Sequence, residues 1–329
     1  MTLTTLVHRF GDPADVVRLE TGADPPPGPG AVRVRMRAAA INPSDLLTIR
    51  GAYASRTALP FRPGFEGVGT IEALGPGVTG IVPGQRVLPI GTAGAWSQVK
   101  TADAAWCFPV PDTLDDHAAA TSYVNPLTAI LMLREHVRPR PGMRIGIDAA
   151  GSAIGGMLVR LAAAAGARVT AIVRHAPGPA LLGDLPAAEV VVLPESDADD
   201  AHCALRDALA GGGLDAALDA VGGAHGTALA HALAPGGLLV HYGLLSGRPL
   251  PPDLQRRRPD IRLVLFHLRA YVHAAPRATI ASALAEAFRL VADGTAASPI
   301  ETVYPLTQIA DALRHAERPG RRGKILLAP

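Results

Sequence analysis

One segment, residues 144–175, constrains the fold of this 329-residue chain more than any other. It reads RIGIDAAGSAIGGMLVRLAAAAGARVTAIVRH, in which an apolar run is followed by a glycine-containing turn and an alanine-rich stretch. The pattern predicts a strand over Arg144–Asp148, a helix over Ala153–Ala165 and a second strand over Arg168–Val173. Strand, turn, helix and strand in this order predict a βαβ unit with parallel strands.

The same alternation continues along the chain. Further apolar strands are expected at residues 189–193, 214–221 and 236–243, with intervening helices near Leu205 and Leu229. Strands that read as unbroken apolar runs are buried on both faces, as in a parallel sheet covered by helices. We therefore expect an α/β protein in which residues 118–293 form a Rossmann-type, doubly wound parallel sheet.

The rest of the chain has a different pattern. In residues 31–42, valine and methionine alternate with arginine, which is the period of a half-buried strand. Short strands are also expected at residues 67–75, 85–90, 95–100 and 323–329, and helices over Pro126–Val137 and Ile280–Ala292. Gly/Pro turns separate the early strands, so this part is predicted to be an antiparallel, barrel-like region.

The turn over Ala149–Gly156 predicts a dinucleotide site. Small residues let a pyrophosphate approach the backbone, and the N-terminus of the following helix presents N–H groups to it. The turn carries only Gly151, Gly155 and Gly156 rather than the full G-x-G-x-x-G, so its setting between strand and helix carries the argument. The alternative is a tight turn that binds nothing.

The end of the second strand predicts which dinucleotide is bound. An NAD-selective site places an acidic residue there, on the ribose hydroxyls, but this strand ends in Arg174 and His175. Since arginine pairs with a 2′-phosphate, we expect NADPH. The alternative is that Arg174 only caps the strand in solvent.

Composition excludes several classes of protein. A net charge of +2 gives no electrostatic case for nucleic acid. The two cysteines, Cys107 and Cys203, lie far apart without metal-ligand spacing, which argues against structural zinc and fits a reducing compartment. No apolar run is long enough to span a membrane and the first residues do not resemble a secretory signal, so we expect a cytoplasmic protein. Lysine occurs only at Lys100 and Lys324.

A family resemblance covers nearly the whole chain. The motifs INPSDLLTIRGAY, GFEGVG, YVNPLTA, AAGSAIGG, IVRH, AVGG, HYGLL, DIRLVLFHL and GKILL occur in that order. In this respect the sequence resembles the medium-chain dehydrogenases/reductases, and more narrowly the zinc-free trans-2-enoyl-CoA/ACP reductases and the quinone oxidoreductases. The resemblance implies a GroES-like β-barrel catalytic domain over residues 1–117 and 294–329, and a homodimer with residues 260–268 as the edge strand.

The resemblance also implies the chemistry. Zinc-dependent relatives have a cysteine and a histidine as ligands where this chain has Asn42 and Phe65, so no catalytic zinc is expected. Without a Lewis acid, the implied reaction is hydride addition to an activated C=C bond, followed by protonation of the α-carbon. In the enoyl-thioester reductases a tyrosine supplies that proton, and Tyr53 occupies the matching position. The alternative is a tyrosine that only packs.

Other positions carry over residue by residue as implied cofactor contacts. Asn125 matches a contact near the nicotinamide, and Arg174 with His175 matches the 2′-phosphate segment. The phosphate turn is matched by Gly151, Ser152, Ala153 and Ile154, the loop after the fifth strand by Tyr242, Gly243, Leu244 and Leu245, the nicotinamide segment by Phe266, His267 and Leu268, and a C-terminal contact by Lys324. His267 stands where the family has tryptophan, as a pocket-lining residue or a second acid.

Three functions remain open. The first is NADPH-dependent reduction of a 2-enoyl thioester or a related α,β-unsaturated carbonyl, the second is NADPH:quinone reduction, and the third is NADPH binding without catalysis. The arginine run Arg256–Arg258 and residues 318–324 are solvated charges or contacts to the phosphates of CoA or an acyl-carrier protein.

Overall fold

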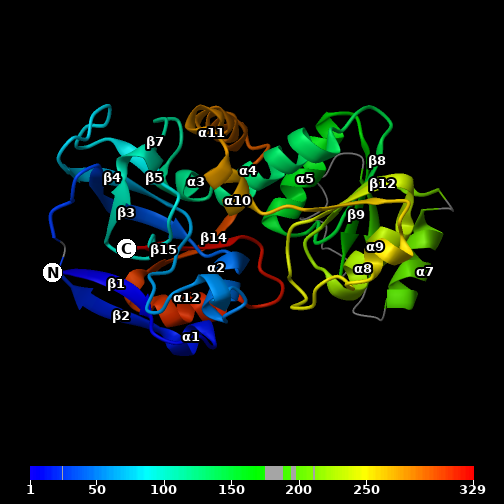
Figure 1. The fold of residues 1–329 in the computed structure, drawn as a ribbon, viewed down its shortest axis with the longest axis horizontal. Coiled ribbons are helices and arrows are strands. Elements are labelled where there is room, and N and C mark those ends of the chain that lie inside the picture. The colour runs from blue at the N-terminus through cyan, green and yellow to red at the C-terminus, as the bar shows by residue number, and fades with distance from the viewer. Residues whose placement is uncertain (24, 175–187, 194–197, 210–211) are drawn as a thin grey trace. The chain divides into compact units, whose positions relative to one another are not determined.

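The computed structural model describes residues 1–23, 25–174, 188–193, 198–209 and 212–329 (Figure 1). The chain divides into two compact units. The first joins Met1–Leu127 to Val272–Pro329, and the second is Thr128–Tyr271. The domain limits expected from the sequence, at 117/118 and 293/294, remain a prediction.

The second unit is built on a six-stranded sheet in which all strand pairs are parallel. In sheet order the strands are β10 (Ala188–Val192), β9 (Arg168–Val173), β8 (Arg144–Ile147), β11 (Leu214–Asp219), β12 (Leu233–His241) and β13 (Arg262–Leu265). The connecting helices include α5 (Ala153–Ala164), α7 (Ala198–Ala208) and α8 (Gly223–Ala232). This confirms the expected doubly wound α/β architecture.

The strand order changes direction at one point in this sheet. From β8 the chain runs outward through β9 and β10, and it then returns to the other side of β8 as β11. In open α/β sheets, ligands bind outside the carboxyl ends of the strands at such a switch point. The carboxyl ends of β8 and β11 are therefore the candidate binding site of this unit.

The first unit contains a seven-stranded sheet. Its strands are β14 (Ile300–Pro305), β15 (Lys324–Ala328), β3 (Ala31–Ala40), β4 (Gly67–Leu74), β5 (Arg86–Pro89) and β7 (Cys107–Pro109), and β6 (Val99–Asp103) pairs with β3. All pairs except β14–β15 are antiparallel, as expected. The two strands of that parallel pair are joined through α12 (Ile309–Ala316). A separate hairpin pairs β1 (Thr2–Val7) with β2 (Val17–Gly22).

The remaining helices of the described chain lie in both units. They are α1 (Pro13–Val16), α2 (Pro43–Ile49), α3 (Asp116–Ala120), α4 (Val124–Leu131), α10 (Leu268–Ala274) and α11 (Arg277–Ala292), with 3₁₀ turns at Ala54–Arg56, Ala104–Trp106 and Leu306–Gln308, and α9 (Leu254–Arg257) in the second unit. Each unit has its own apolar core. The core of the first includes Trp96 and Ile71, and that of the second includes Leu214, Leu229 and Leu239.

Several element boundaries differ from those expected. The helix expected over Pro126–Val137 is α4 followed by a π-helical segment, Met132–Val137. The helix expected from Ile280 begins at Arg277, because the fixed φ of Pro276 suits a helix entry. Residues 260–268 do not form one continuous strand, since β13 ends at Leu265 and α10 begins at Leu268.

Both lysines of the chain are buried. Lys100 is 3% exposed and donates hydrogen bonds from Nζ to the carbonyl oxygens of Pro89 and Thr92, both at 2.6 Å. Burial lowers the pKa of Lys100 to about 8. Lys324 is 5% exposed and belongs to the site described below.

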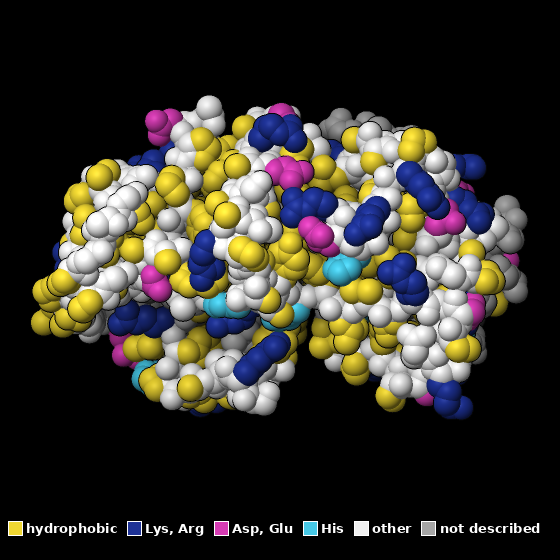
Figure 2. All heavy atoms as spheres, turned by 45° about the horizontal axis from the view of Figure 1, so that its top comes forward, with side chains coloured by type: hydrophobic (Ala, Val, Ile, Leu, Met, Phe, Trp, Pro, Cys, Tyr) yellow, Lys and Arg dark blue, Asp and Glu magenta, His cyan; other side chains and the backbone are white. Residues whose placement is uncertain are grey.

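The distribution of charge on the surface and the polarity of the helices are those expected from the sequence. On the face drawn in Figure 2, Lys and Arg side chains are interspersed with acidic and apolar ones rather than gathered into one basic area. None of the helices in the described part of the chain is both long enough and apolar enough to cross a membrane.

Candidate active site

The turn after β8 is the predicted phosphate turn. Ala149 has a φ of 44°, which is an uncommon conformation for a residue other than glycine. Ser152 caps α5, its Oγ accepting a hydrogen bond from the Gly155 N–H at 3.1 Å. A Cβ on Gly155 would lie 2.2 Å from the carbonyl oxygen of Ala149, so only glycine fits there. These contacts fix the path of the backbone into α5.

Gly151 in the same turn has a different reason to be glycine. A Cβ built on it meets no other atom within 4 Å, and its φ lies outside the left-handed region, so the protein's own packing does not require glycine there. Open space beside the backbone, at the N-terminus of a twelve-residue helix, fits a pyrophosphate group. The predicted contacts Gly151, Ser152, Ala153 and Ile154 thus lie together at the switch point.

The predicted 2′-phosphate segment begins at the end of β9. Arg174 follows the last residue of that strand and is exposed. Its neighbour His175 lies outside the described residues. The carboxyl ends of β8 and β9 are adjacent in the sheet, because Ala171 pairs with Ile147.

The loop after β12 lies at the same edge of the sheet. The Tyr242 N–H donates to the Asp219 carbonyl at 2.9 Å, and the Leu245 N–H donates to the Ala220 carbonyl at 3.0 Å. A Cβ on Gly243 would lie 2.5 Å from the same Ala220 oxygen, so this loop passes close to the end of β11. The predicted contacts Tyr242–Leu245 and the phosphate turn therefore meet at the carboxyl edge.

The predicted nicotinamide segment continues from β13. Phe266 is 7% exposed, and its N–H donates to the His241 carbonyl at 2.9 Å. His267 is exposed, and its Nδ1 accepts a hydrogen bond from the Ala270 N–H at 3.3 Å, at the start of the helix that Leu268 opens. The sequence predicted His267 as a pocket-lining residue or a second acid, and it did not predict this hydrogen bond at the start of α10.

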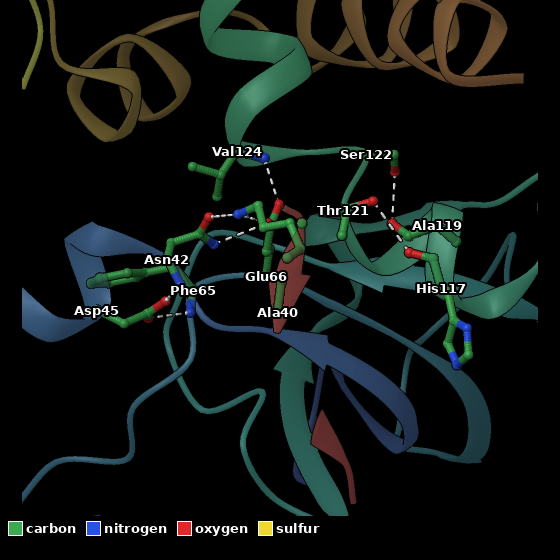
Figure 3. A network of polar contacts seen from close by, with 12 residues as sticks. Ala40, Asn42, Asp45, Phe65, Glu66, His117, Ala119, Thr121, Ser122 and Val124 are labelled. Carbon is green, nitrogen blue, oxygen red and sulfur yellow. Dashed lines mark hydrogen bonds and ion pairs between the residues drawn. The ribbon is translucent and has the colours of Figure 1, made fainter. Parts of the chain in front are cut away.

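In the first unit, Asn42 and Glu66 form the centre of a buried polar network (Figure 3). Asn42 Nδ2 donates to Glu66 Oε1 at 2.9 Å, and Lys324 Nζ donates to Asn42 Oδ1. The Lys324 ammonium also lies 3.8 Å from Glu66 Oε1. Burial lowers the pKa of Lys324, whereas the negative charges of Glu66 and Asp45 oppose that shift.

Glu66 also positions the predicted cofactor contact Asn125. Its Oε2 accepts a hydrogen bond of 2.6 Å from the N–H of Val124, the first residue of α4 (Figure 3). A carboxylate is favourable at a helix N-terminus, where it satisfies an N–H group that has no partner within the helix. Asn125 is the next residue and is 9% exposed.

Asp45 explains the position of Phe65. The N–H groups of Phe65 and Asn42 donate to the two oxygens of the Asp45 carboxyl, each at 2.9 Å (Figure 3). Asp45 therefore holds the backbone of Phe65. The side chain of Phe65 has no atom that could bind a metal ion. Burial raises the pKa of Asp45 to about 7, although these two hydrogen bonds lower it.

Tyr53 lies in the first unit, on the segment that follows α2. It is the N-cap residue of the 3₁₀ turn Ala54–Arg56 and is partly exposed. The guanidinium of Arg56 lies 4.4 Å from the centre of the phenol ring, which is a cation–π arrangement. A phenol that is neither buried nor fixed in a core can act as a proton donor to a bound molecule.

The structure brings four residues into these sites that the sequence motifs do not indicate. Asp45 and Glu66 lie within the motifs of the first unit, and Asp148 and Asp219 lie at the ends of predicted strands. An acidic residue at the carboxyl end of an apolar strand is the signal that could have found the last two.

The described residues contain no group of three or more His, Cys, Asp or Glu side chains placed to hold a metal ion. At the two positions where zinc-dependent relatives have ligands, Asn42 has both side-chain atoms engaged by Lys324 and Glu66, and Phe65 has no ligand atom. These residues do not fit a zinc ion.

Comparisons with known proteins agree with the fold. The family described as alcohol dehydrogenase GroES-like domain matches residues 28–112, and the family described as zinc-binding dehydrogenase matches residues 185–327. A solved structure from Bacillus thuringiensis, assigned as an NADPH:quinone reductase, is 31% identical, covers 100% of this chain and 99% of its own, and has a TM-score of 0.91. The chain belongs to the medium-chain dehydrogenase/reductase family.

Within the medium-chain dehydrogenases/reductases, the matches fall in the zinc-free branch of enoyl reductases and quinone oxidoreductases. The mitochondrial enoyl-[acyl-carrier-protein] reductase of Bos taurus is 37% identical over 245 residues, which are 73% of this chain and 65% of that protein. A mycobacterial protein solved with NADPH is 28% identical, with 100% of both chains covered and a TM-score of 0.88. The match to the GroES-like family over residues 28–112 lies in the first unit, as expected.

Proposed function

We propose that this protein is an NADPH-dependent reductase of the C=C bond of a 2-enoyl thioester or a related α,β-unsaturated carbonyl. The observation that carries the proposal is that one chain has both a phosphate turn and a buried polar network without zinc ligands at Asn42 and Phe65. The turn has room for a pyrophosphate beside Gly151, and the positions of the zinc ligands are taken by Asn42 and Phe65. The similarity to an enoyl reductase and to an NADPH-bound structure supports it.

NADPH, when bound, supplies a hydride to the β-carbon of the substrate. The chain's own residues have three tasks. The turn 149–154 and the N-terminus of α5 bind the pyrophosphate, and Arg174 pairs with the 2′-phosphate. Glu66 fixes the start of α4 and with it Asn125, the proposed contact near the nicotinamide.

Tyr53 is the proposed acid. Hydride addition at the β-carbon leaves an enolate, and a proton must reach the α-carbon to complete the reduction. An un-ionised phenol is a suitable donor at neutral pH, since the reference pKa of tyrosine is about 10. The tyrosine hydroxyl then regains its proton from water.

Quinone reduction is the second candidate. It is supported by the fold match with the Bacillus thuringiensis protein over the whole chain. A quinone needs no protein acid, because water can protonate its reduced oxygens. Non-catalytic NADPH binding is the third possibility, and a phenol at the position of Tyr53 gives it no support.

Turnover separates these functions. With NADPH in excess, we expect the purified protein to reduce crotonyl-CoA. The reaction is monitored by the loss of NADPH absorbance and by the loss of the enoyl thioester. A simple quinone and a saturated acyl-CoA are the matched comparisons. Faster reduction of the quinone than of every enoyl substrate would reverse the order of the first two candidates, and no turnover of either with intact NADPH binding would favour the third.

A further inference from the structure

Two buried aspartates meet at the switch point of the parallel sheet. Asp148 follows β8, Asp219 ends β11, and both are 0% exposed. The register pairs Ile147 with Leu218, so the two aspartates are the next positions on neighbouring strands. Two adjacent carboxyl groups without solvent cannot both be ionised at low cost.

The hydrogen-bond partners show which of the two carries the charge. Asp219 Oδ1 accepts from the N–H groups of Val221 at 2.9 Å and Gly222 at 2.8 Å, and its Oδ2 lies 2.6 Å from His241 Nδ1. Asp148 Oδ1 accepts a hydrogen bond from the Ala220 N–H at 2.7 Å. The larger set of polar partners around Asp219 favours a charge on Asp219 and a proton on Asp148.

The second oxygen of Asp148 supports the same assignment. Asp148 Oδ2 is buried, and it accepts no hydrogen bond from any backbone N–H or hydroxyl group of the described residues. Burial and the charge of Asp219 raise the pKa of Asp148 well above its ordinary value. Burial opposes ionisation of Asp219 too, but the hydrogen bonds from His241 and its other partners hold the pKa of Asp219 below its ordinary value.

We propose that Asp148 is a positioning residue that stays protonated and shares its proton with Asp219, so that the pair acts as one anion holding the cofactor loops together. The proposal rests on the proposed function as an NADPH-binding protein. Asp148 directly precedes the turn residue Ala149, whose φ is positive. Through Ala220 and Asp219 the pair fixes the chain after β11, to which the loop 242–246 is bonded.

The groups that surround the pair fit this role. His241 ends β12 and faces Asp219 with Nδ1. Tyr242 follows, and its buried hydroxyl has no hydrogen-bond partner among the described residues. Burial raises the pKa of Tyr242 well above its ordinary value, and the negative charge of the aspartate pair adds to the shift. A second ionised carboxyl would face this uncharged hydroxyl and the anion of Asp219, and it would force the loops apart.

Asparagine and valine substitutions of Asp148 distinguish the role of its proton from the role of its side-chain volume. Asp148→Asn keeps an acceptor for Ala220 and places N–H donors toward Asp219, as the protonated acid does, and we expect its Kd for NADPH to stay within about threefold of wild type. Asp148→Val has a similar shape without either group, and Asp219→Asn removes the anion. We expect both to weaken NADPH binding by about tenfold or more.

Infrared spectroscopy tests the proton without any cofactor. At neutral pH the difference spectrum of wild type minus Asp148→Asn should contain the C=O band of a protonated carboxylic acid. Its absence, or tolerance of Asp219→Asn together with damage by Asp148→Asn, would overturn the proposal. If wild type binds no NADPH, the proposed function fails, and the infrared band alone then decides the state of Asp148.

Discussion

Lys324 Nζ donates a hydrogen bond to the side-chain oxygen of Asn42, across 282 positions of the sequence. The ammonium also lies beside the carboxylate of Glu66. A buried lysine thus joins the polar network at Asn42, one of the two positions where the resemblance places a metal ligand in zinc-dependent relatives.

The first prediction concerns metal content. Because Asn42 and Phe65 do not supply ligands and Lys324 already neutralises Glu66, we expect less than stoichiometric zinc by elemental analysis and full activity after chelation. Lys324→Met should leave Glu66 as an unpaired buried charge and destabilise the fold by roughly 3–5 kcal/mol in urea unfolding. Stoichiometric zinc with chelator-sensitive activity would contradict this account.

The second prediction is a dependence of stability on pH through Asp45. Its pKa is about 7 in the folded protein against an ordinary value of 3.8. Between these values the folded protein holds a proton that the unfolded chain has released. The free energy of unfolding should therefore fall as pH rises from about 4 to about 7, by at most about 1.4 kcal/mol per pH unit, and this contribution is lost above that window.

Urea unfolding of wild type and Asp45→Asn over this pH range measures the effect. The variant should have a shallower slope, because residue 45 no longer titrates. Asp15→Asn is the matched control, since Asp15 is exposed and should leave the slope unchanged. Equal slopes for wild type and Asp45→Asn would show that Asp45 does not titrate in this window.

The third prediction concerns Tyr53. Tyr53→Phe removes one hydroxyl from a partly exposed ring and should leave NADPH affinity nearly unchanged. Loss of a general acid should lower kcat on an enoyl thioester by roughly 10²–10⁴-fold, while quinone reduction should keep most of its rate. A variant within about threefold of wild type on every enoyl substrate would remove Tyr53 from the mechanism.

The fourth prediction concerns cofactor preference. Arg174→Ala should weaken NADPH binding relative to NADH by about 10- to 150-fold, the equivalent of roughly 1.5–3 kcal/mol for a charge-assisted contact. Arg168→Ala is the matched control, because Arg168 is exposed at the opposite end of the same strand. Titration of both variants with both nucleotides measures the ratio, and an unchanged ratio for Arg174→Ala would refute the assignment.

The fifth prediction is a homodimer formed through β13. This strand ends the sheet order, and Leu265 is 71% exposed. Pairing with a second copy would satisfy the outer backbone of the strand and cover that side chain. Light scattering should give twice the mass of one chain for wild type and for Val82→Arg, another exposed apolar position, but the mass of one chain for Leu265→Arg. A monomeric wild type at micromolar concentration would exclude the dimer.

The sequence predicted the parallel sheet because its strands are continuous apolar runs between glycine turns. It did not predict the hairpin of β1 and β2, whose residues are of mixed exposure and give no clear alternation. The sequence also did not predict α10, because residues 260–268 predict one strand that includes Leu268. The period of the hydrophobic pattern alone does not show where a partly exposed strand ends.

The candidate site was predictable only in its local parts. The phosphate turn lies within a few residues of one strand, so composition and order identify it. The contact of Asn42 with Glu66 spans 24 positions and that with Lys324 spans 282, and single residues so far apart carry no pattern. The proton balance of Asp148 and Asp219 depends on burial and on donor positions that only the folded chain defines.

The burial of both lysines has a practical consequence for chemical labelling. Lys100 and Lys324 are 3% and 5% exposed, and no other lysine exists in the chain. Amine-reactive dyes and cross-linkers should therefore react with the folded protein mainly at its terminal amine. Dye attachment becomes directed to one place, whereas lysine cross-linking would fail to capture a dimer even if one forms. Unfolding in urea should release both ε-amines, so the number of dyes bound per chain reports the folded state.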